Sequence, residues 1–203
     1  MISYIDLLSL LLAFFVLLYT LSNVDKSKFK SMSEALGNAV AEQNKKDQSE
    51  QFKQEDLAKV QSELAAYFES NKLADRVNMN MTPEGLRIAM SASFFEVGED
   101  ALLPDGVEVL HAIALKVKDK TYKLRIEGHT DNVPIHTDKF PNNWFLSAAR
   151  ACSVIQYLLK TGMEPGRMSA VGLADQVPLV ANDSPEHRGQ NRRIELIVVR
   201  FKE

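Results

Sequence analysis

Residues 123–159 read KLRIEGHTDNVPIHTDKFPNNWFLSAARACSVIQYLL, and this stretch decides the fold. The first six residues, KLRIEG, have the alternation of a β-strand, and a polar loop follows them. Apolar residues then return at helical spacing over residues 143–159, and Gly162 is placed to end the helix. A strand, a loop and an amphipathic helix in this order indicate a domain that combines strands with helices.

The loop and the helix carry polar side chains with complementary chemistry. Asp131 offers an acceptor-only carboxylate, and Arg150 offers a planar fork of donors. Asn143, Ser147 and Arg150 are spaced i, i+4 and i+7, so they share one face of the predicted helix. This spacing alone leaves two interpretations open. Asp131 and Arg150 either grip a ligand that bears an ammonium and a carboxylate, from opposite sides of a groove, or pair with each other.

The flanking segments complete an α+β domain of the βαβαβ type over residues 71–203. Alternating residues on both sides of a TPEG turn predict a β-hairpin. One helix is expected before the hairpin and another after it, and two more strands follow the central helix. The predicted helices cover residues 54–70 and 104–118, and the predicted strands cover residues 77–81, 86–90, 167–172 and 193–201.

Residues 2–21 read ISYIDLLSLLLAFFVLLYTL, an apolar run with one acid. Twenty helical residues span ~30 Å, the thickness of a bilayer core, so we predict a single N-terminal transmembrane helix. Asp6 is costly in such a place, and it shares its helix face with Ser9, Ala13 and Thr20, which favours packing against partner helices. A cleaved signal peptide and a plain membrane anchor are the alternatives, and we favour an ion-binding role for Asp6.

The segment after the apolar run divides into two parts. Residues 22–41 carry one apolar stripe at helical spacing, which suits a helix that packs on a membrane surface, a partner or a second copy. The stripe consists of Phe29, Met32, Leu36 and Val40. Residues 42–55 are almost entirely polar and predict a solvated linker, so we group residues 42–70 as a linker that leads into a helix.

Residues 128–196 resemble the OmpA-like peptidoglycan-binding domain. They contain its hallmarks G-H-T-D, N-x-x-L-S-x-x-R-A and N-R-R-I-E, at residues 128–131, 143–151 and 191–195. The resemblance implies that Asp131 and Arg150 bind the diaminopimelate of the peptidoglycan stem peptide. It implies weaker roles, in lining or supporting the groove, for Asn143, Leu146 and Arg193.

Residues 2–40 resemble the flagellar stator B subunit, the MotB type, in which an ion-carrying aspartate stands where Asp6 stands here. The resemblance implies that residues 22–41 are a plug that blocks ion flow, with the apolar stripe as its packing face. It also implies a homodimer, a multi-span stator A subunit of the MotA type as partner, and a single-pass place in the inner membrane.

Charge near the apolar run bears on the orientation of the chain. Lys26, Lys28 and Lys30 follow the run, and by charge alone they place the C-terminal side in the cytoplasm. The sequence also departs from the family pattern before the run, where the family has a basic tail and this sequence starts at Met1. We expect the C-terminal domain on the periplasmic or cell-wall side, because a long domain is translocated largely regardless of charge.

The composition argues against several classes of function. A formal net charge of −3 over 203 residues gives no electrostatic reason to expect nucleic acid as a partner. Cys152 is the only cysteine, which rules out an intrachain disulfide, and neither metal-ligand spacing nor a catalytic set stands out. We predict no enzyme, cofactor or metal, but a wall-anchored stator subunit that conducts H⁺ or Na⁺. The alternatives are a stator-like channel of a non-flagellar system and a passive inner-membrane tether.

Overall fold

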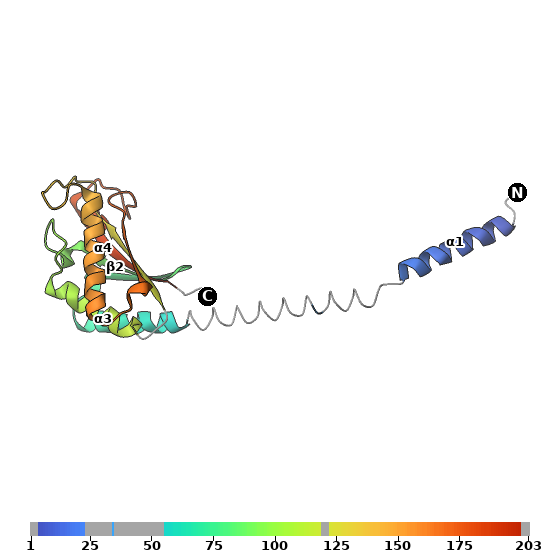
Figure 1. The fold of residues 1–203 in the computed structure, drawn as a ribbon, viewed down its shortest axis with the longest axis horizontal. Coiled ribbons are helices and arrows are strands. Elements are labelled where there is room, and N and C mark those ends of the chain that lie inside the picture. Colours follow the sequence, from blue (N-terminus) through green and yellow to red (C-terminus); the bar gives the residue numbers. More distant parts are fainter. Residues whose placement is uncertain (1–3, 23–33, 35–54, 119–121, 200–203) are drawn as a thin grey trace. The chain divides into compact units, whose positions relative to one another are not determined.

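The computed structural model describes residues 4–22, 34, 55–118 and 122–199 (Figure 1). The chain divides into two compact units, Met1–Phe52 and Lys53–Glu203. The four residues of the apolar stripe, Phe29, Met32, Leu36 and Val40, lie outside the described residues.

Helix α1, Tyr4–Ser22, makes up most of the described part of the first unit and falls on the stretch where a helix was predicted. Asp6 lies in its first turn, where the positive end of the helix dipole favours an acid. Ser9 Oγ donates a hydrogen bond to the backbone carbonyl of Asp6 at 2.9 Å. Across the described parts of the chain, no helix combines the length and the apolar character needed to cross a membrane.

A five-stranded sheet in the order β1-β2-β5-β3-β4 forms the centre of the second unit. The predicted hairpin is confirmed, and β5 lies antiparallel between β2 and β3. Strand β4 pairs with β3 in parallel, and α4 is the crossover between them (Figure 1). The strands are β1 (Val77–Thr82), β2 (Gly85–Ser91), β3 (Lys123–His129), β4 (Met168–Gly172) and β5 (Arg193–Val199).

The predicted helices are also present. Residues 55–70 are helical, and α3 (Pro104–Val117) and α4 (Asn143–Lys160) match their predicted ranges within one residue. Asn142 fixes the start of α4, because its side chain accepts hydrogen bonds from the backbone amides of Trp144 and Phe145. The short helix α5 (Pro185–Asn191) was not predicted, although Ser184 caps it and Pro185 stands at its first position.

Side chains alternate along each strand, so the sheet has two different faces. On the apolar face, Ile88, Leu196 and Ile126 are paired in register across β2, β5 and β3 and are fully buried. The helix over residues 55–70, which was grouped with the linker, contributes to the same core through Leu57, Val60, Leu64 and Phe68. The opposite face is polar and carries Arg87, Arg125, Glu127, His129, Arg193 and Glu195.

Two glycines let α4 lie directly against the sheet. A Cβ on Gly128 would stand 2.0 Å from the carbonyl oxygen of Ser147, and one on Gly172 would stand 2.7 Å from the amide nitrogen of Ala148. Neither backbone leaves room for a side chain. The first half of α4 is therefore held against the ends of β3 and β4, and this contact fixes the position of Arg150 relative to the loop after β3.

Candidate functional site

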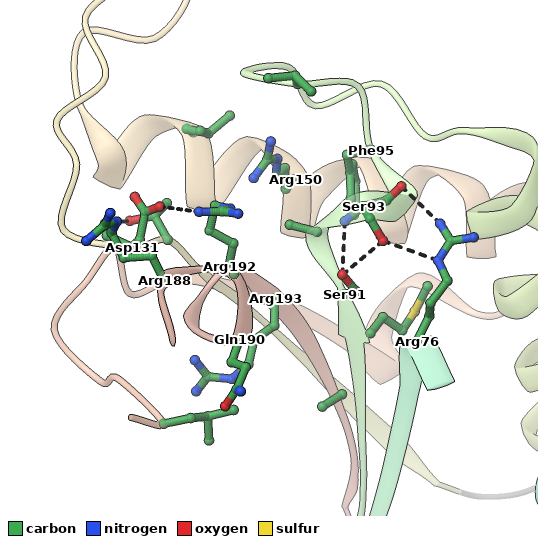
Figure 2. Close-up of a pocket in the computed structure, with 18 of the residues that line it drawn as sticks. Arg76, Ser91, Ser93, Phe95, Asp131, Arg150, Arg188, Gln190, Arg192 and Arg193 are labelled. Atoms are coloured by element: carbon green, nitrogen blue, oxygen red, sulfur yellow. Dashed lines mark hydrogen bonds and ion pairs between the residues drawn. The ribbon is translucent and has the colours of Figure 1, made fainter. Parts of the chain in front are cut away.

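A groove of about 1340 Å³ opens at the ends of β2, β3 and β5 (Figure 2). Its walls come from β1 and β2, from the loop after β3, from α4 and from α5. The groove brings together all the residues of the second unit that were predicted to bind peptidoglycan. These residues are Asp131, Asn143, Leu146, Arg150 and Arg193.

Asp131 lies at the start of the loop after β3 and is 7% exposed. Its Oδ1 accepts a hydrogen bond from the Val133 amide at 3.1 Å, which fixes the carboxylate on one side. Its Oδ2 lies 2.6 Å from Nη1 of Arg192. The cation beside Asp131 is therefore Arg192, and the interpretation in which Asp131 and Arg150 pair with each other is wrong.

Arg150 projects from α4 into the groove and is 5% exposed. Its Nε donates to the carbonyl of Glu99 at 2.8 Å, and its Nη2 reaches the carbonyl of Glu96 at 3.5 Å. Its guanidinium carbon lies 5.4 Å from the centre of the Phe95 ring. Among the described residues, no carboxylate lies within ion-pair distance of Arg150. Burial, and then the charge of Arg192, lower the pKa of the Arg150 guanidinium.

Asn143 ties the loop after β3 to the start of α4. Its Nδ2 donates to the carbonyls of Asp131 and Val133 at 3.2 Å and 3.0 Å, and its Oδ1 accepts from the Ile135 amide at 3.3 Å. Ser147, one turn further on, accepts a hydrogen bond from the Ala174 amide at 3.1 Å and so holds the loop after β4. The shared helix face thus organises the walls of the groove.

The two arginines of the N-R-R-I-E motif have different surroundings. Arg193 is 3% exposed, and its guanidinium binds Glu195 and the carbonyls of Asn191 and Val177. Arg192 has a side chain that is 45% exposed and turns toward Asp131. Figure 2 shows its guanidinium on the side of the groove that Asp131 occupies. The sequence interpretation named Arg193 and missed Arg192, although the two stand side by side in the motif.

Glu127, His129 and Glu195 place carboxylate oxygens and an imidazole nitrogen within 4.8 Å of one another on the polar face of the sheet. These atoms suit a metal ion, but Glu195 already binds Arg87 and Arg193, and Glu127 binds Arg125. His129 is 1% exposed, and both of its ring nitrogens lack a hydrogen-bond partner. Burial, followed by the charge of Arg193, lowers the pKa of His129 to about 4. Because arginines already hold both carboxylates, this cluster does not fit a metal.

Comparisons with known proteins agree with this arrangement. Residues 94–192 match the OmpA family, and residues 1–40 match the family described as membrane MotB of the proton-channel complex MotA/MotB. The uncharacterized protein YtxE of Bacillus subtilis (strain 168) is 33% identical over 214 residues, which cover 100% of this chain and 88% of YtxE. The chain belongs to the MotB-like family. Its second unit carries the OmpA-like domain.

Two further relatives of this MotB-like chain are named for different systems. Motility protein B of Bacillus subtilis (strain 168) is 29% identical over 233 residues, which cover 98% of this chain and 89% of that protein. The cell wall anchor of the T6SS from Pseudomonas aeruginosa matches with a TM-score of 0.62 and 30% identity, over 68% of this chain and 97% of that one. One relative is named for motility and the other for anchoring to the cell wall.

Proposed function

We propose that this chain is a stator subunit that conducts ions through Asp6 and anchors its complex to peptidoglycan through the groove of the OmpA-like domain. The observation that carries the proposal is that Asp131 and Arg150 line one groove without pairing with each other. Arg150 is buried without a carboxylate partner, and Asp131 is held nearby by a partly exposed arginine. Burying a charge without a partner is costly, so a protein that retains such a charge has a use for it.

The diaminopimelate of the peptidoglycan stem suits this groove. The free end of its side chain carries an ammonium and a carboxylate on one carbon. Asp131 offers a carboxylate to the ammonium, and Arg150 offers guanidinium hydrogens to the carboxylate. Asn143, Leu146 and Arg193 line the same groove and support it.

The N-terminal unit supplies the second half of the proposal. Residues 2–21 form one apolar run with a single acid, and the match to the MotB family covers residues 1–40. The large apolar side chains along α1 are exposed, and lipid together with partner helices would cover them. We place this run in the inner membrane as a single span, with the OmpA-like domain on the periplasmic or cell-wall side. The partners are a multi-span A subunit of the MotA type and a second copy of this chain.

A passive tether to the cell wall is the second candidate, and the similarity to the T6SS cell wall anchor favours it. A tether needs the groove but has no use for a carboxylate in the apolar run. A stator-like channel that serves another system needs both. A role for Asp6 therefore distinguishes a channel from a passive tether. The identity of the partner subunit distinguishes a flagellar stator from a stator-like channel of another system.

The test of ion conduction is Asp6→Asn in the full chain, co-expressed with its A-type partner. This change keeps the size of the side chain and removes its charge, so ion flux through the complex should fall to background. Asp6→Glu is the matched control, since it keeps a carboxylate and should retain part of the flux. Unchanged flux in Asp6→Asn would remove the ion-carrying role of Asp6.

The test of wall binding is a pulldown of the unit Lys53–Glu203 with isolated peptidoglycan. This unit includes the helix over residues 55–70, which the core requires. Arg150→Ala and Asp131→Ala each remove one charge-assisted contact worth roughly 1.5–3 kcal/mol, so binding should weaken ~10- to 100-fold. Lys160→Ala removes a cation from the far end of α4 and should bind normally. Wild-type binding by both groove variants, with normal circular dichroism, would move the anchoring role elsewhere.

A further inference from the structure

The contact between Arg192 and Asp131 is built so that it can be exchanged. Nη1 is the one guanidinium nitrogen of Arg192 that makes a hydrogen bond to the described residues, at 2.6 Å from Asp131 Oδ2. The Arg192 side chain is 45% exposed. Its backbone is fixed, because its amide donates to the Arg188 carbonyl and its carbonyl accepts from the Ala92 amide. A single contact at the edge of water is weak compared with a two-point pair between guanidinium and carboxylate.

Arg150 presents the opposite situation, a well-held guanidinium that no carboxylate of the described residues contacts directly. Its Nε and Nη2 are fixed by backbone carbonyls, and its Nη1 makes no hydrogen bond within the described residues. Two nearby carboxylates, on Glu99 and Asp100, are already bound to Lys139. Arg150 and Arg192 are close enough for their charges to repel, and Asp131 lies near both while it pairs with Arg192. The hydrogens on Nη1 of Arg150 therefore remain available to an anionic group in the groove.

We propose that Arg192 is the residue that makes the groove select ligands with both an ammonium and a carboxylate. The inference rests on the proposed function, in which Asp131 and Arg150 receive these two groups. In the free protein, Arg192 fills the place beside Asp131 that a ligand ammonium takes. On binding, the ammonium replaces Arg192 at Asp131, and the released guanidinium turns to the ligand carboxylate beside Arg150.

Selectivity follows from this exchange of partners. A ligand without the carboxylate must displace Arg192 from Asp131 and offers the displaced cation no new partner. A ligand without the ammonium leaves Arg192 on Asp131 and meets Arg150 alone. A ligand that carries both charges gives Asp131, Arg150 and Arg192 each an oppositely charged partner. The groove therefore rejects incomplete ligands through a competing internal cation, in addition to the contacts that it makes with complete ones.

Arg188 provides a matched control for this role. It lies one turn before Arg192 and also lines the groove. Its Nη1 donates to the carbonyl of Asn182 at 3.2 Å, and it makes no ion pair among the described residues. Neutralising Arg188 changes the charge of the groove by the same amount as neutralising Arg192. It does not free Asp131.

The experiment measures dissociation constants of the full chain in detergent for two synthetic peptides. One is L-alanyl-γ-D-glutamyl-meso-diaminopimelate, and the other is the same peptide with the free carboxylate of the diaminopimelate side chain converted to an amide. Wild type should prefer the acid by ~10- to 100-fold. Arg192→Gln should bind the amide ~3- to 10-fold more tightly than wild type does, because Asp131 is no longer occupied, and its preference for the acid should shrink accordingly. Arg188→Gln should weaken both peptides by a similar factor and keep the preference.

Two outcomes overturn the inference while leaving the proposed function intact. Arg192→Gln weakens both peptides equally, or it changes neither of them. Binding of neither peptide by wild type overturns the proposed function itself, and the inference with it. If circular dichroism shows that Arg192→Gln does not fold, Arg192→Lys tests the inference instead. That variant keeps a competing cation and should keep the preference for the acid. Loss of the preference in that variant would show that the competing charge is not the cause.

Discussion

Two clusters of charged side chains meet near the ends of β3 and β5, and the protein pairs them differently. On the polar face of the sheet, Glu195 binds both Arg87 and Arg193. In the groove, Asp131 pairs with Arg192, and no carboxylate of the described residues contacts Arg150 directly. The first cluster balances its charges within the protein, and the second leaves a guanidinium for something else. Under the proposed function, the same residue types serve stability in one place and ligand recognition in the other.

The largest effect expected from this difference is a loss of stability in Glu195→Gln. The side chains of Arg193 and Glu195 are 4% and 1% exposed, so removing the carboxylate leaves a buried guanidinium without its counter-charge. Breaking a buried pair in this way costs about 3–5 kcal/mol. Urea denaturation of the unit Lys53–Glu203 measures the change.

Glu84→Gln is the control for that experiment. Glu84 pairs with Arg125 at 2.7 Å, but its side chain is 52% exposed. Its loss should cost less than about 1 kcal/mol, as for most surface pairs. Equal midpoints for Glu84→Gln and Glu195→Gln would contradict the view that the polar face is held by buried charge.

The second effect is a pH dependence caused by His129. Its pKa in the folded protein is about 4, against 6.5 for an ordinary histidine, so the unfolded chain binds a proton over this interval and the folded protein does not. Folding stability should therefore fall as the pH drops from about 6.5 toward 4 and should lose roughly 3 kcal/mol over that window. Below the lower pKa, both states are protonated and this contribution levels off.

Denaturation midpoints of wild type and His129→Gln across that range isolate the effect. The variant lacks the titrating ring, so the wild-type midpoint should fall relative to that of the variant as the pH drops. Carboxylates that titrate in the same range affect both proteins alike. Parallel curves would mean that the pKa of His129 is the same in the folded and the unfolded protein, so that burial does not lower it.

Much of the fold follows from local patterns in the sequence. The hairpin, α3 and α4 follow from alternation, helical spacing and capping residues, which act between near neighbours. The short helix α5 was not predicted, because its seven residues, PEHRGQN, carry no apolar stripe. The contribution of the helix over residues 55–70 to the hydrophobic core was also not predicted, because it depends on contacts with strands far along the chain.

The groove was predictable in its members but not in its pairings. Motif spacing pointed to Asp131 and Arg150, and both line the groove. The partner of Asp131 depends on where β5 begins. Arg193 is the first residue of that strand and its guanidinium binds Glu195, whereas the guanidinium of Arg192, one residue earlier, binds Asp131. A shift of one residue in the strand start would exchange their roles, and local sequence patterns do not define strand ends that closely.

The smallest expected effect lies at the rim of the groove, in Lys139→Met. Lys139 Nζ contacts Glu99 at 3.0 Å and Asp100 at 2.5 Å, and its side chain is 55% exposed. The change should leave the denaturation midpoint unchanged, because exposed pairs are screened by water and salt.

Lys139→Met should still loosen the loop that supplies the Glu99 carbonyl to Arg150. At low salt, the Glu99 amide, which donates to the Glu96 carbonyl at 3.1 Å, should exchange its hydrogen ~2- to 5-fold faster than in wild type. At about 1 M salt the difference should vanish. A shift in the midpoint as large as that of Glu195→Gln would mean that the rim pair carries as much stability as the buried network, and the contrast between the two clusters would fail.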